Sequence, residues 1–186
     1  MAIGNGLKLD IWKSITSRFY IQHIVEHYGS TEMPGDAILN YFDIPGKCGY
    51  LPPLIASQKS ATGEGGVLVK YDTEEESVVR TQSGRCILCL PNEIGEMIMR
   101  LPNGKYDGYI GEKETNNKLY RNVFEDGDVW WSSGDLLSVD EIGFFTFEDR
   151  AGDSFRRKGE NVSTAEIEIH LGKMKYNFLE INGMFI

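Results

Sequence analysis

Three short stretches of the chain carry side chains suited to binding a phosphorylated small molecule. The first is the run Tyr28, Gly29, Ser30, Thr31, Glu32, which follows a strand-like segment. Thr31 offers a hydroxyl and a nearby backbone N–H to a phosphate, and Glu32 offers a hard oxygen of the kind that Mg²⁺ takes together with substrate phosphates. Tyr28 offers a flat face to a base. Ligands bind at the carboxyl ends of strands in open α/β sheets, so this stretch is a candidate site. A strand-to-turn junction with a capping hydroxyl would give the same pattern.

The second stretch is a small-residue turn with an acid, Ser132 to Asp135. Gly134 allows the backbone to come close to a ligand. Asp135 can accept two hydrogen bonds from a ribose diol, as acidic residues do in dinucleotide sites. An aspartate that only caps a turn or a helix is the alternative interpretation.

The third stretch is Asp149 to Asn161, where charge, glycine and arginine crowd together. Arg150 can reach a ribose or a phosphate with its fork of donors. Gly152 and Asp153 stand at a break in composition, and such positions often form hinges. A charged surface linker would explain this stretch alone, but the three stretches in this order favour a nucleotide site.

Other kinds of site have weaker support. The pair Cys86 and Cys89 has C-x-x-C spacing, but it lies in an apolar, strand-like run without a second pair or a nearby histidine, so an ordinary buried role is favoured over metal or redox chemistry. The histidines show neither H-x-x-H nor H-E-x-x-H spacing, which argues against zinc. The chain contains no G-x-S-x-G elbow and no complete phosphate-binding P-loop motif.

Composition sets wide limits. The 186 residues are 41% hydrophobic and 25% charged, as in ordinary globular proteins, and fit one large domain or one domain plus part of another. A net charge of −9 argues against nucleic acid as the main partner. The sequence contains no apolar run of the roughly 18 residues that cross a bilayer, which leaves surface attachment open.

The hydrophobic pattern predicts a mixed chain of helices and short strands. The turn Gly4 to Gly6 should follow a strand, and we expect that strand to be missing. Closely spaced short strands indicate a small β-barrel or sandwich beside a first α/β unit. The predicted elements are helices at Asp10–Phe19, Asn117–Phe124 and Ser163–Leu171, and strands at Tyr20–His27, Gly66–Tyr71, Arg85–Leu90, Glu96–Leu101 and Phe144–Glu148.

Several motifs resemble the adenylate-forming synthetases, and within them the fatty acid transport protein / very-long-chain acyl-CoA synthetase family. The resemblance spans roughly residues 3 to 168, and its last motif is the most specific to this family. The motifs are GNGLKLDIW (Gly4–Trp12), EHYGSTE (Glu26–Glu32), GEMIMRL with YDGYIG (Gly95–Gly111), SSGDLL (Ser132–Leu137) and DRAGDSFRRKGENVSTAEIE (Asp149–Glu168).

This resemblance implies an α/β (mixed α+β) fold. Residues 1–149 would form the carboxy-terminal part of the AMP-binding large domain, an α/β unit plus a small β-barrel. Residues 150–186 would form a hinge and the truncated start of the small carboxy-terminal domain. A phosphate loop upstream of Gly4 and a late catalytic lysine are both expected in the family and absent here. We therefore expect an incomplete chain without synthetase activity of its own.

The resemblance also implies a role for each candidate residue. Tyr28 would stack near adenine, Thr31 would contact the nucleotide phosphate, and Glu32 would ligate Mg²⁺. Asp135 would bind the ribose hydroxyls with help from Arg150. The other implied positions are Gly29 and Ser30 for the nucleotide, Gly152 and Asp153 for the hinge, and Gly159 to Asn161 for the surface that faces CoA.

The implied reaction joins a fatty acid and ATP into an acyl-adenylate and pyrophosphate, and then transfers the acyl group to CoA with release of AMP. The implied partners are fatty acid, ATP, Mg²⁺ and CoA, with no nucleic acid. The full-length family member would be intracellular and associated with the endoplasmic reticulum or plasma membrane. Two alternatives remain, namely a ligase for another carboxylate and an inactive interaction or regulatory domain. The sequence does not indicate the oligomeric state.

Overall fold

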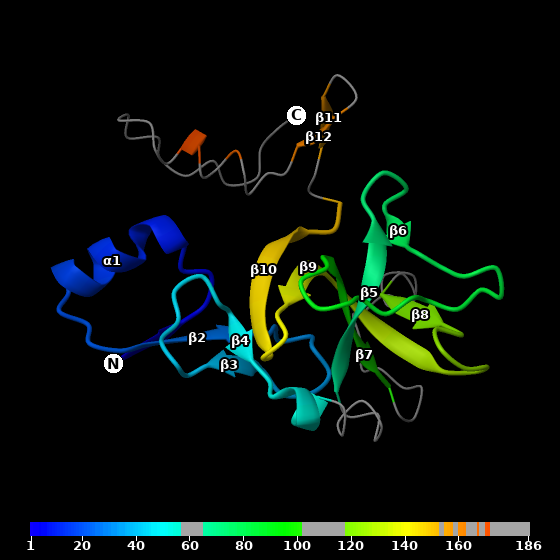
Figure 1. Cartoon of the computed structure of the whole chain (residues 1–186), viewed down its shortest axis with the longest axis horizontal. Helices are drawn as coiled ribbons and strands as arrows, with labels where there is room; N and C mark the ends of the chain where they lie inside the picture. The colour runs from blue at the N-terminus through cyan, green and yellow to red at the C-terminus, as the bar shows by residue number, and fades with distance from the viewer. Residues whose placement is uncertain are drawn as a thin grey trace.

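The computed structural model describes residues 1–56, 65–101, 118–152, 155–157, 160–162, 167 and 170–171. In these residues a ten-stranded sheet follows the order β1-β2-β3-β4-β10-β9-β7-β5-β6, with β8 paired to β9 (Figure 1). A separate pair joins β11 to β12. The elements are β1 (Ala2–Gly4), α1 (Leu9–Arg18), β2 (Ile24–Tyr28), β3 (Ile38–Asn40), β4 (Gly49–Tyr50), β5 (Gly66–Asp72), β6 (Ser77–Val78), β7 (Gly95–Arg100), β8 (Leu119–Arg121), β9 (Val129–Val139), β10 (Phe144–Arg150), β11 (Phe155–Arg157) and β12 (Glu160–Val162).

The amino-terminal end of the sheet is a β-α-β unit. β1 pairs with β2 in parallel, and α1 connects them. The expectation that no strand precedes the Gly4–Gly6 turn was therefore wrong. Two apolar residues and a glycine are enough for β1, because β2 supplies its hydrogen-bonding partners. The loop after β1 is held by Glu26 of β2, whose Oε1 accepts a hydrogen bond from the Leu7 N–H at 3.2 Å.

The helix is as predicted, but the strand after it begins later. α1 ends at Arg18, and Tyr20 has φ of 53°, a left-handed conformation that often ends helices. The Ile21 N–H then donates to the Thr16 carbonyl at 3.0 Å. These bonds occupy the chain that we assigned to the start of a strand, so β2 begins at Ile24.

Two corrections concern the middle of the chain. Within the described part of Asn117–Phe124, the structure has strand β8 and a turn instead of a helix. β8 is a strand because β9 lies beside it as a partner. The segment Arg85–Leu90 is extended, but it makes only isolated bridges, at Cys86 and Leu88.

The two predicted parts, an α/β unit and a group of short strands, are joined in one continuous sheet. The junction is the pairing of β4 with β10, where Phe144 lies opposite Tyr50. The rings of these two residues are 4.5 Å apart, and Phe42 packs edge-on against both, at 4.9 Å from Tyr50 and 5.7 Å from Phe144. Figure 1 shows β10 between the helical end and the larger group of strands.

The core lies on both faces of the strands around β9, which pairs with β10, β7 and β8. One cluster contains Tyr28, Leu68, Met97, Leu137 and Phe145. The second contains Val69, Cys86, Ile98, Val123 and Trp130, and the third contains Met99, Leu101, Val129 and Trp131.

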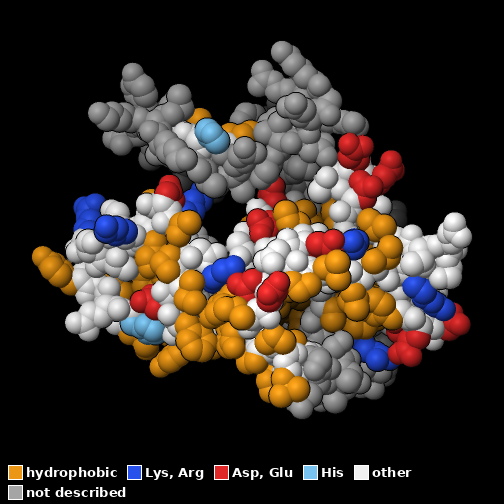
Figure 2. Space-filling model, in the orientation of Figure 1, with side chains coloured by type: hydrophobic (Ala, Val, Ile, Leu, Met, Phe, Trp, Pro, Cys, Tyr) orange, Lys and Arg blue, Asp and Glu red, His pale blue; other side chains and the backbone are white. Residues whose placement is uncertain are grey.

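Several large apolar side chains are exposed, especially around α1, β3 and β4. Figure 2 shows hydrophobic side chains gathered over part of the molecular surface that it presents. They include Leu9, Phe19, Leu39, Tyr41, Phe42 and Leu54, each more than half exposed except Leu39 at 47%. Among the residues that the structure describes, no helix is long and apolar enough to cross a membrane.

Candidate functional site

Three of the predicted site residues meet at one point. The Tyr28 hydroxyl, at the end of β2, donates a hydrogen bond of 2.9 Å to Oδ2 of Asp135. Arg150 lies opposite Asp135 in the β10–β9 ladder, and its Nε is 3.7 Å from Oδ1 of Asp135. Residues 107 positions apart in the chain, Tyr28 and Asp135, are thereby in direct contact. Tyr28 orients one oxygen of this carboxylate, and Arg150 forms an ion pair with the other.

The environment of Tyr28 keeps its hydroxyl protonated. Its side chain is 9% exposed and packs with Leu68 and Leu137. Burial and, secondarily, the negative charge of Asp135 raise the pKa of the Tyr28 hydroxyl far above its usual value of 10.0. Tyr28 is therefore a hydrogen-bond donor to the Asp135 carboxylate at physiological pH.

Asp135 lies inside β9, and the prediction of a turn at Ser132–Asp135 was wrong. The strand bulges here. In the ladder with β7, Glu96 pairs with Leu136 and Ile98 pairs with Ser132, so an advance of two residues along β7 corresponds to four residues along β9. Gly134 has φ of 74°, which L side chains rarely adopt. A bulge re-aims side chains, and this one positions Asp135 to face Tyr28.

The bulge has a buried carboxylate beside it that sequence reasoning missed. Glu96 of β7 is 1% exposed, and its Oε1 accepts hydrogen bonds from the Ser132 hydroxyl and, at 3.2 Å, from the Gly134 N–H. Its Oε2 accepts from the Tyr120 hydroxyl at 2.8 Å. A glutamate among the apolar residues of GEMIMR was a signal that could have identified it.

The loop after β2 carries the other candidates. Thr31 and Glu32 are exposed, in a turn closed by the Met33 N–H on the Ser30 carbonyl at 3.2 Å. Gly29 lies against Ala37, and a Cβ on this glycine would be 3.0 Å from the Ala37 Cβ. The loop therefore presents Ser30, Thr31 and Glu32 to solvent just beyond Tyr28.

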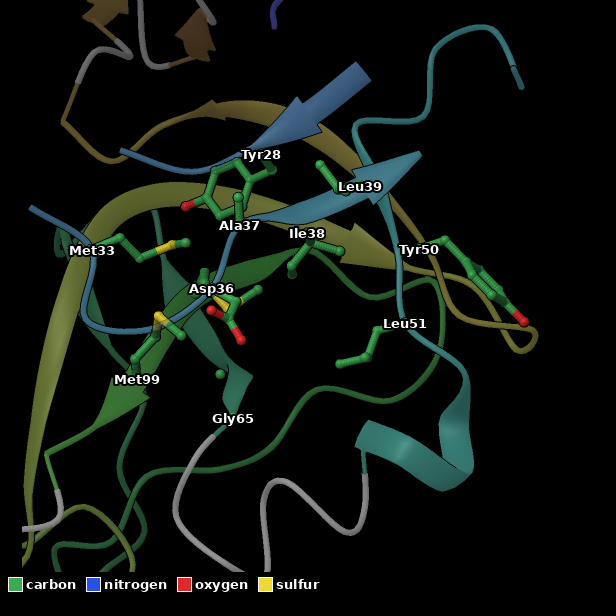
Figure 3. A pocket seen from close by; sticks show the side chains of 12 residues that line it. Tyr28, Met33, Asp36, Ala37, Ile38, Leu39, Tyr50, Leu51, Gly65 and Met99 are labelled. Atoms are coloured by element: carbon green, nitrogen blue, oxygen red, sulfur yellow. The ribbon is translucent and has the colours of Figure 1, made fainter. Parts of the chain in front are cut away.

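A cavity of about 260 Å³ adjoins Tyr28 (Figure 3). Most of its wall is apolar, with Met33, Met97 and Met99 among the lining residues. Figure 3 shows the Asp36 carboxylate among the side chains that line it. The cavity is smaller than the roughly 300–1,000 Å³ typical of small-molecule pockets. Tyr28 is among the residues that line this cavity, and its adenine-stacking role stays a prediction.

The predicted hinge begins where β10 ends, at Arg150. The Arg150 side chain is 71% exposed, which leaves donors of its guanidinium open to solvent. Gly152 has φ of 85°, and its missing Cβ would point into open space. Asp153 and Gly159 lie outside the described residues, so the hinge and the CoA-facing surface stay predictions.

The C-x-x-C pair does not form a site. Cys86 packs in the cluster with Ile98, whereas Cys89 packs against the cluster of Met97, and both thiols are free. Side chains three positions apart in an extended segment point to opposite faces. In the part of the chain that the structure describes, no group of three or more His, Cys, Asp or Glu side chains could hold a metal.

The thiols are expected to react slowly with alkylating agents. Burial raises the pKa of Cys89 to about 11 and that of Cys48 to about 12, from 9.0. Because the thiolate is the nucleophile, Cys89 at pH 8 should react roughly 100-fold more slowly than in urea-unfolded chain. Mass spectrometry after timed iodoacetamide treatment measures this, and equal rates in the folded and unfolded chain would contradict the buried position of the thiols.

The chain is similar to curated fatty acid transport proteins, although no family model matches it. It is 37% identical over 178 residues to long-chain fatty acid transport protein 1 of Mus musculus, a match that covers 94% of this chain and 27% of the relative. It is 40% identical over 190 residues to the very long-chain fatty acid transport protein of Saccharomyces cerevisiae, covering 92% of this chain and 26% of the relative. The chain thus spans about a quarter of the length of these relatives.

Solved structures share the fold. The O-succinylbenzoate coenzyme A synthetase of Bacillus subtilis, in complex with ATP and magnesium ion, has a TM-score of 0.58 at 22% identity, over 93% of this chain and 31% of that one. ATP-bound MatB from Rhodopseudomonas palustris has a TM-score of 0.61 at 21% identity, over 92% of this chain and 29% of that one. The mixed α/β fold with its large sheet, as predicted, matches the corresponding parts of these two structures.

Proposed function

We propose that this chain, which corresponds to one segment of the fatty acid transport protein / very-long-chain acyl-CoA synthetase family, forms the ribose-binding part of an ATP-dependent fatty acid–CoA ligase. One observation carries the proposal. Asp135 is 22% exposed and is held from two sides, with Tyr28 on one carboxylate oxygen and Arg150 near the other. An acid arranged in this way is suited to accept hydrogen bonds from a diol.

The ribose diol would donate to the Asp135 carboxylate, beside the Tyr28 hydroxyl and the Arg150 guanidinium. An ionised carboxylate offers about four acceptor positions, and the Tyr28 hydroxyl takes one of them. The exposed guanidinium of Arg150 would contribute further donors to the ribose or a phosphate. The chain would thus recognise the sugar of ATP and AMP through the Asp135 carboxylate and the exposed Arg150 guanidinium beside it.

The exposed loop of Thr31 and Glu32 would serve the phosphates. A hydroxyl and a carboxylate fit Mg²⁺, which takes one or two carboxylates together with substrate phosphates. When bound, Mg²⁺ neutralises charge on the phosphates during attack. Thr31 would donate its hydroxyl to a phosphate oxygen, and Gly29 and Ser30 would hold the loop near the nucleotide.

In the complete protein, the proposed reaction is fatty acid plus ATP to acyl-adenylate and pyrophosphate, then CoA to acyl-CoA and AMP. The names of the relatives support a long-chain acid and a role in fatty acid transport, and hence membrane association. Residues 150–186 would begin a second domain that rotates about Gly152 and Asp153. The solved neighbour named for succinylbenzoate favours a ligase for another carboxylate as the second candidate.

Calorimetric titration with AMP and with 2′,3′-dideoxy-AMP tests the ribose role. We expect AMP to give a saturating heat at millimolar concentration or below. The dideoxy compound lacks both hydroxyls that Asp135 would bind, so its affinity should be at least tenfold lower, about 1.4 kcal/mol or more. Equal affinities for the two compounds, or no heat at millimolar AMP, would reject the proposal for this chain.

A further inference from the structure

One peptide group in the β9 bulge is held at both ends by side chains of opposite charge. The Gly134 N–H donates to Oε1 of Glu96 at 3.2 Å. The carbonyl of the same peptide, on Ser133, accepts from Lys118 Nζ at 3.2 Å. A charged acceptor and a charged donor make stronger hydrogen bonds than neutral groups. The plane of this peptide is therefore fixed, one residue before the Asp135 side chain.

Burial of the Glu96 carboxylate would lower the stability of the fold if hydrogen bonds did not compensate for the lost contact with water. Glu96 is 1% exposed, and a buried carboxylate is destabilising when it lacks hydrogen-bond partners. Here it has three, from Ser132, Gly134 and Tyr120. Two of these hydrogen bonds come from the bulge, from Ser132 and Gly134, so the main structural role of the Glu96 carboxylate is to hold the bulge.

The ladder with β7 gives no partner to Ser133, Gly134 or Asp135. At Ser133 to Asp135 the β9 chain carries two residues more than the opposing β7 chain, so the regular ladder cannot pair them all. The Gly134 N–H is partly buried, and leaving such a donor without an acceptor costs free energy. Without the Glu96 carboxylate, the Gly134 N–H would gain by turning toward water, which would disturb the bulge that positions Asp135.

We infer that Glu96 is a positioning residue for nucleotide recognition, because it fixes the Ser133–Gly134 peptide and so aims Asp135 at Tyr28. The nucleotide as ligand rests on the proposed function, whereas the role of Glu96 in fixing the peptide rests on its hydrogen bonds alone. Glu96 touches the bulge and not the proposed ligand. Its loss should therefore lower affinity through disorder at Asp135.

The test compares Glu96 variants with control variants of the 186-residue chain. Glu96→Leu removes both acceptors but keeps an apolar side chain of similar length. Tyr120→Phe removes only the hydroxyl on Oε2, away from the bulge. Ile98→Val, two residues along the same strand, creates a small core cavity that costs about 0.5–1.5 kcal/mol and serves as the matched control for lost stability.

Two quantities are measured, the amide hydrogen exchange of Gly134 and Asp135 by NMR and the affinity for AMP. In Glu96→Leu we expect exchange at Gly134 to be at least tenfold faster and AMP affinity to be at least fivefold lower. In Tyr120→Phe and Ile98→Val both quantities should stay within threefold of the wild type. Glu96→Gln, which still offers an oxygen to the Gly134 N–H, should restore both.

The outcomes separate this inference from the proposed function. Unchanged Gly134 exchange in Glu96→Leu, or an equal rise in Ile98→Val, would overturn the positioning role whether or not AMP binds. AMP binding that Asp135→Ala weakens but Glu96→Leu does not would also overturn it, with the proposed function intact. Wild-type chain that binds no AMP refutes the proposed function, and exchange at Gly134 still decides the role of Glu96. If Glu96→Leu does not fold, Glu96→Asp, which withdraws the carboxylate by one methylene, takes its place.

Discussion

Asp135→Ala is expected to lower the affinity of the chain for AMP by about 10- to 100-fold. The substitution removes the acceptor of the ribose hydroxyls, and hydrogen bonds to charged groups contribute about 1.5–3 kcal/mol. It also frees the Tyr28 hydroxyl and the Arg150 guanidinium from their shared partner. Titration calorimetry at one salt concentration measures the change.

The matched control is Glu141→Ala, which removes the same charge from an exposed position between β9 and β10. Its AMP affinity should stay within twofold of the wild type, because Glu141 lies at the turn end of the β9–β10 hairpin and the Asp135–Arg150 pair lies at the other end, and salt screens separated surface charges. An equal loss in both variants would point to net charge as the cause. Unchanged affinity in Asp135→Ala would exclude the ribose role.

Asp128→Ala should give the largest loss of stability, about 3–4 kcal/mol, since each buried donor left unsatisfied costs about 1–3 kcal/mol. The Asp128 carboxylate is 7% exposed and holds the turn from β8 to β9. Its Oδ1 accepts from the Val123 N–H at 2.6 Å, and its Oδ2 accepts from the N–H groups of Phe124 and Glu125 and from the Trp130 indole. Urea unfolding followed by tryptophan fluorescence measures the loss.

Asp126→Ala is the control, because it removes the same group two residues away, at a side chain that is 95% exposed. Asp126 pairs only with Arg85 at 2.7 Å in the contacts described, and an exposed pair contributes about 0–1 kcal/mol. A similar stability in the two variants would show that the four bonds to Asp128 do not hold this turn.

The stability that Asp128 contributes should depend on pH in a defined direction. Burial alone would raise the pKa of Asp128, but the hydrogen bonds from Phe124, Trp130 and Val123 outweigh it and hold the pKa below 3.8. A depressed folded-state pKa gives stability that is fully present above the unfolded value and is lost as pH falls below it. The difference between wild type and Asp128→Asn should therefore be constant from pH 7 to 5 and shrink below about pH 4. A difference that grows on acidification would contradict this sign.

Elements with a clear apolar pattern could be predicted from the sequence, and those defined by a partner could not. α1, β5, β7 and β10 agree with the predicted helix and strands, because α1 repeats its apolar residues at helical spacing and the three strands contain short apolar runs bounded by turn residues or charges. β8 is three residues long and has no pattern of its own. Its conformation is set by β9 beside it, and β9 follows it in the chain.

The candidate site divides in the same way. Residue type and order were enough to select Tyr28, Asp135 and Arg150, which the structure brings into contact. The strand conformation of Ser132–Asp135 was missed, since small residues and glycine usually indicate a turn. Here Glu96, buried in the neighbouring strand, supplies the bond that lets glycine remain within a strand.

The extra residues of the β9 bulge make chain length, and not only residue identity, a condition of the site. In this segment β9 has two more residues than β7. Because side chains along a strand alternate between the two faces, an even number of extra residues leaves Ser132 and Leu136 on the same side of the sheet. A deletion of one residue between Ser132 and Leu136 would reverse which face of the sheet each side chain points to, on one side of the deletion. Either Leu137, which is fully buried, or Trp131, at 3%, would then turn to the opposite face of the sheet and leave the cluster in which it packs. Homologous chains should tolerate substitutions in this segment more readily than insertions or deletions, and any length change that persists should come in pairs.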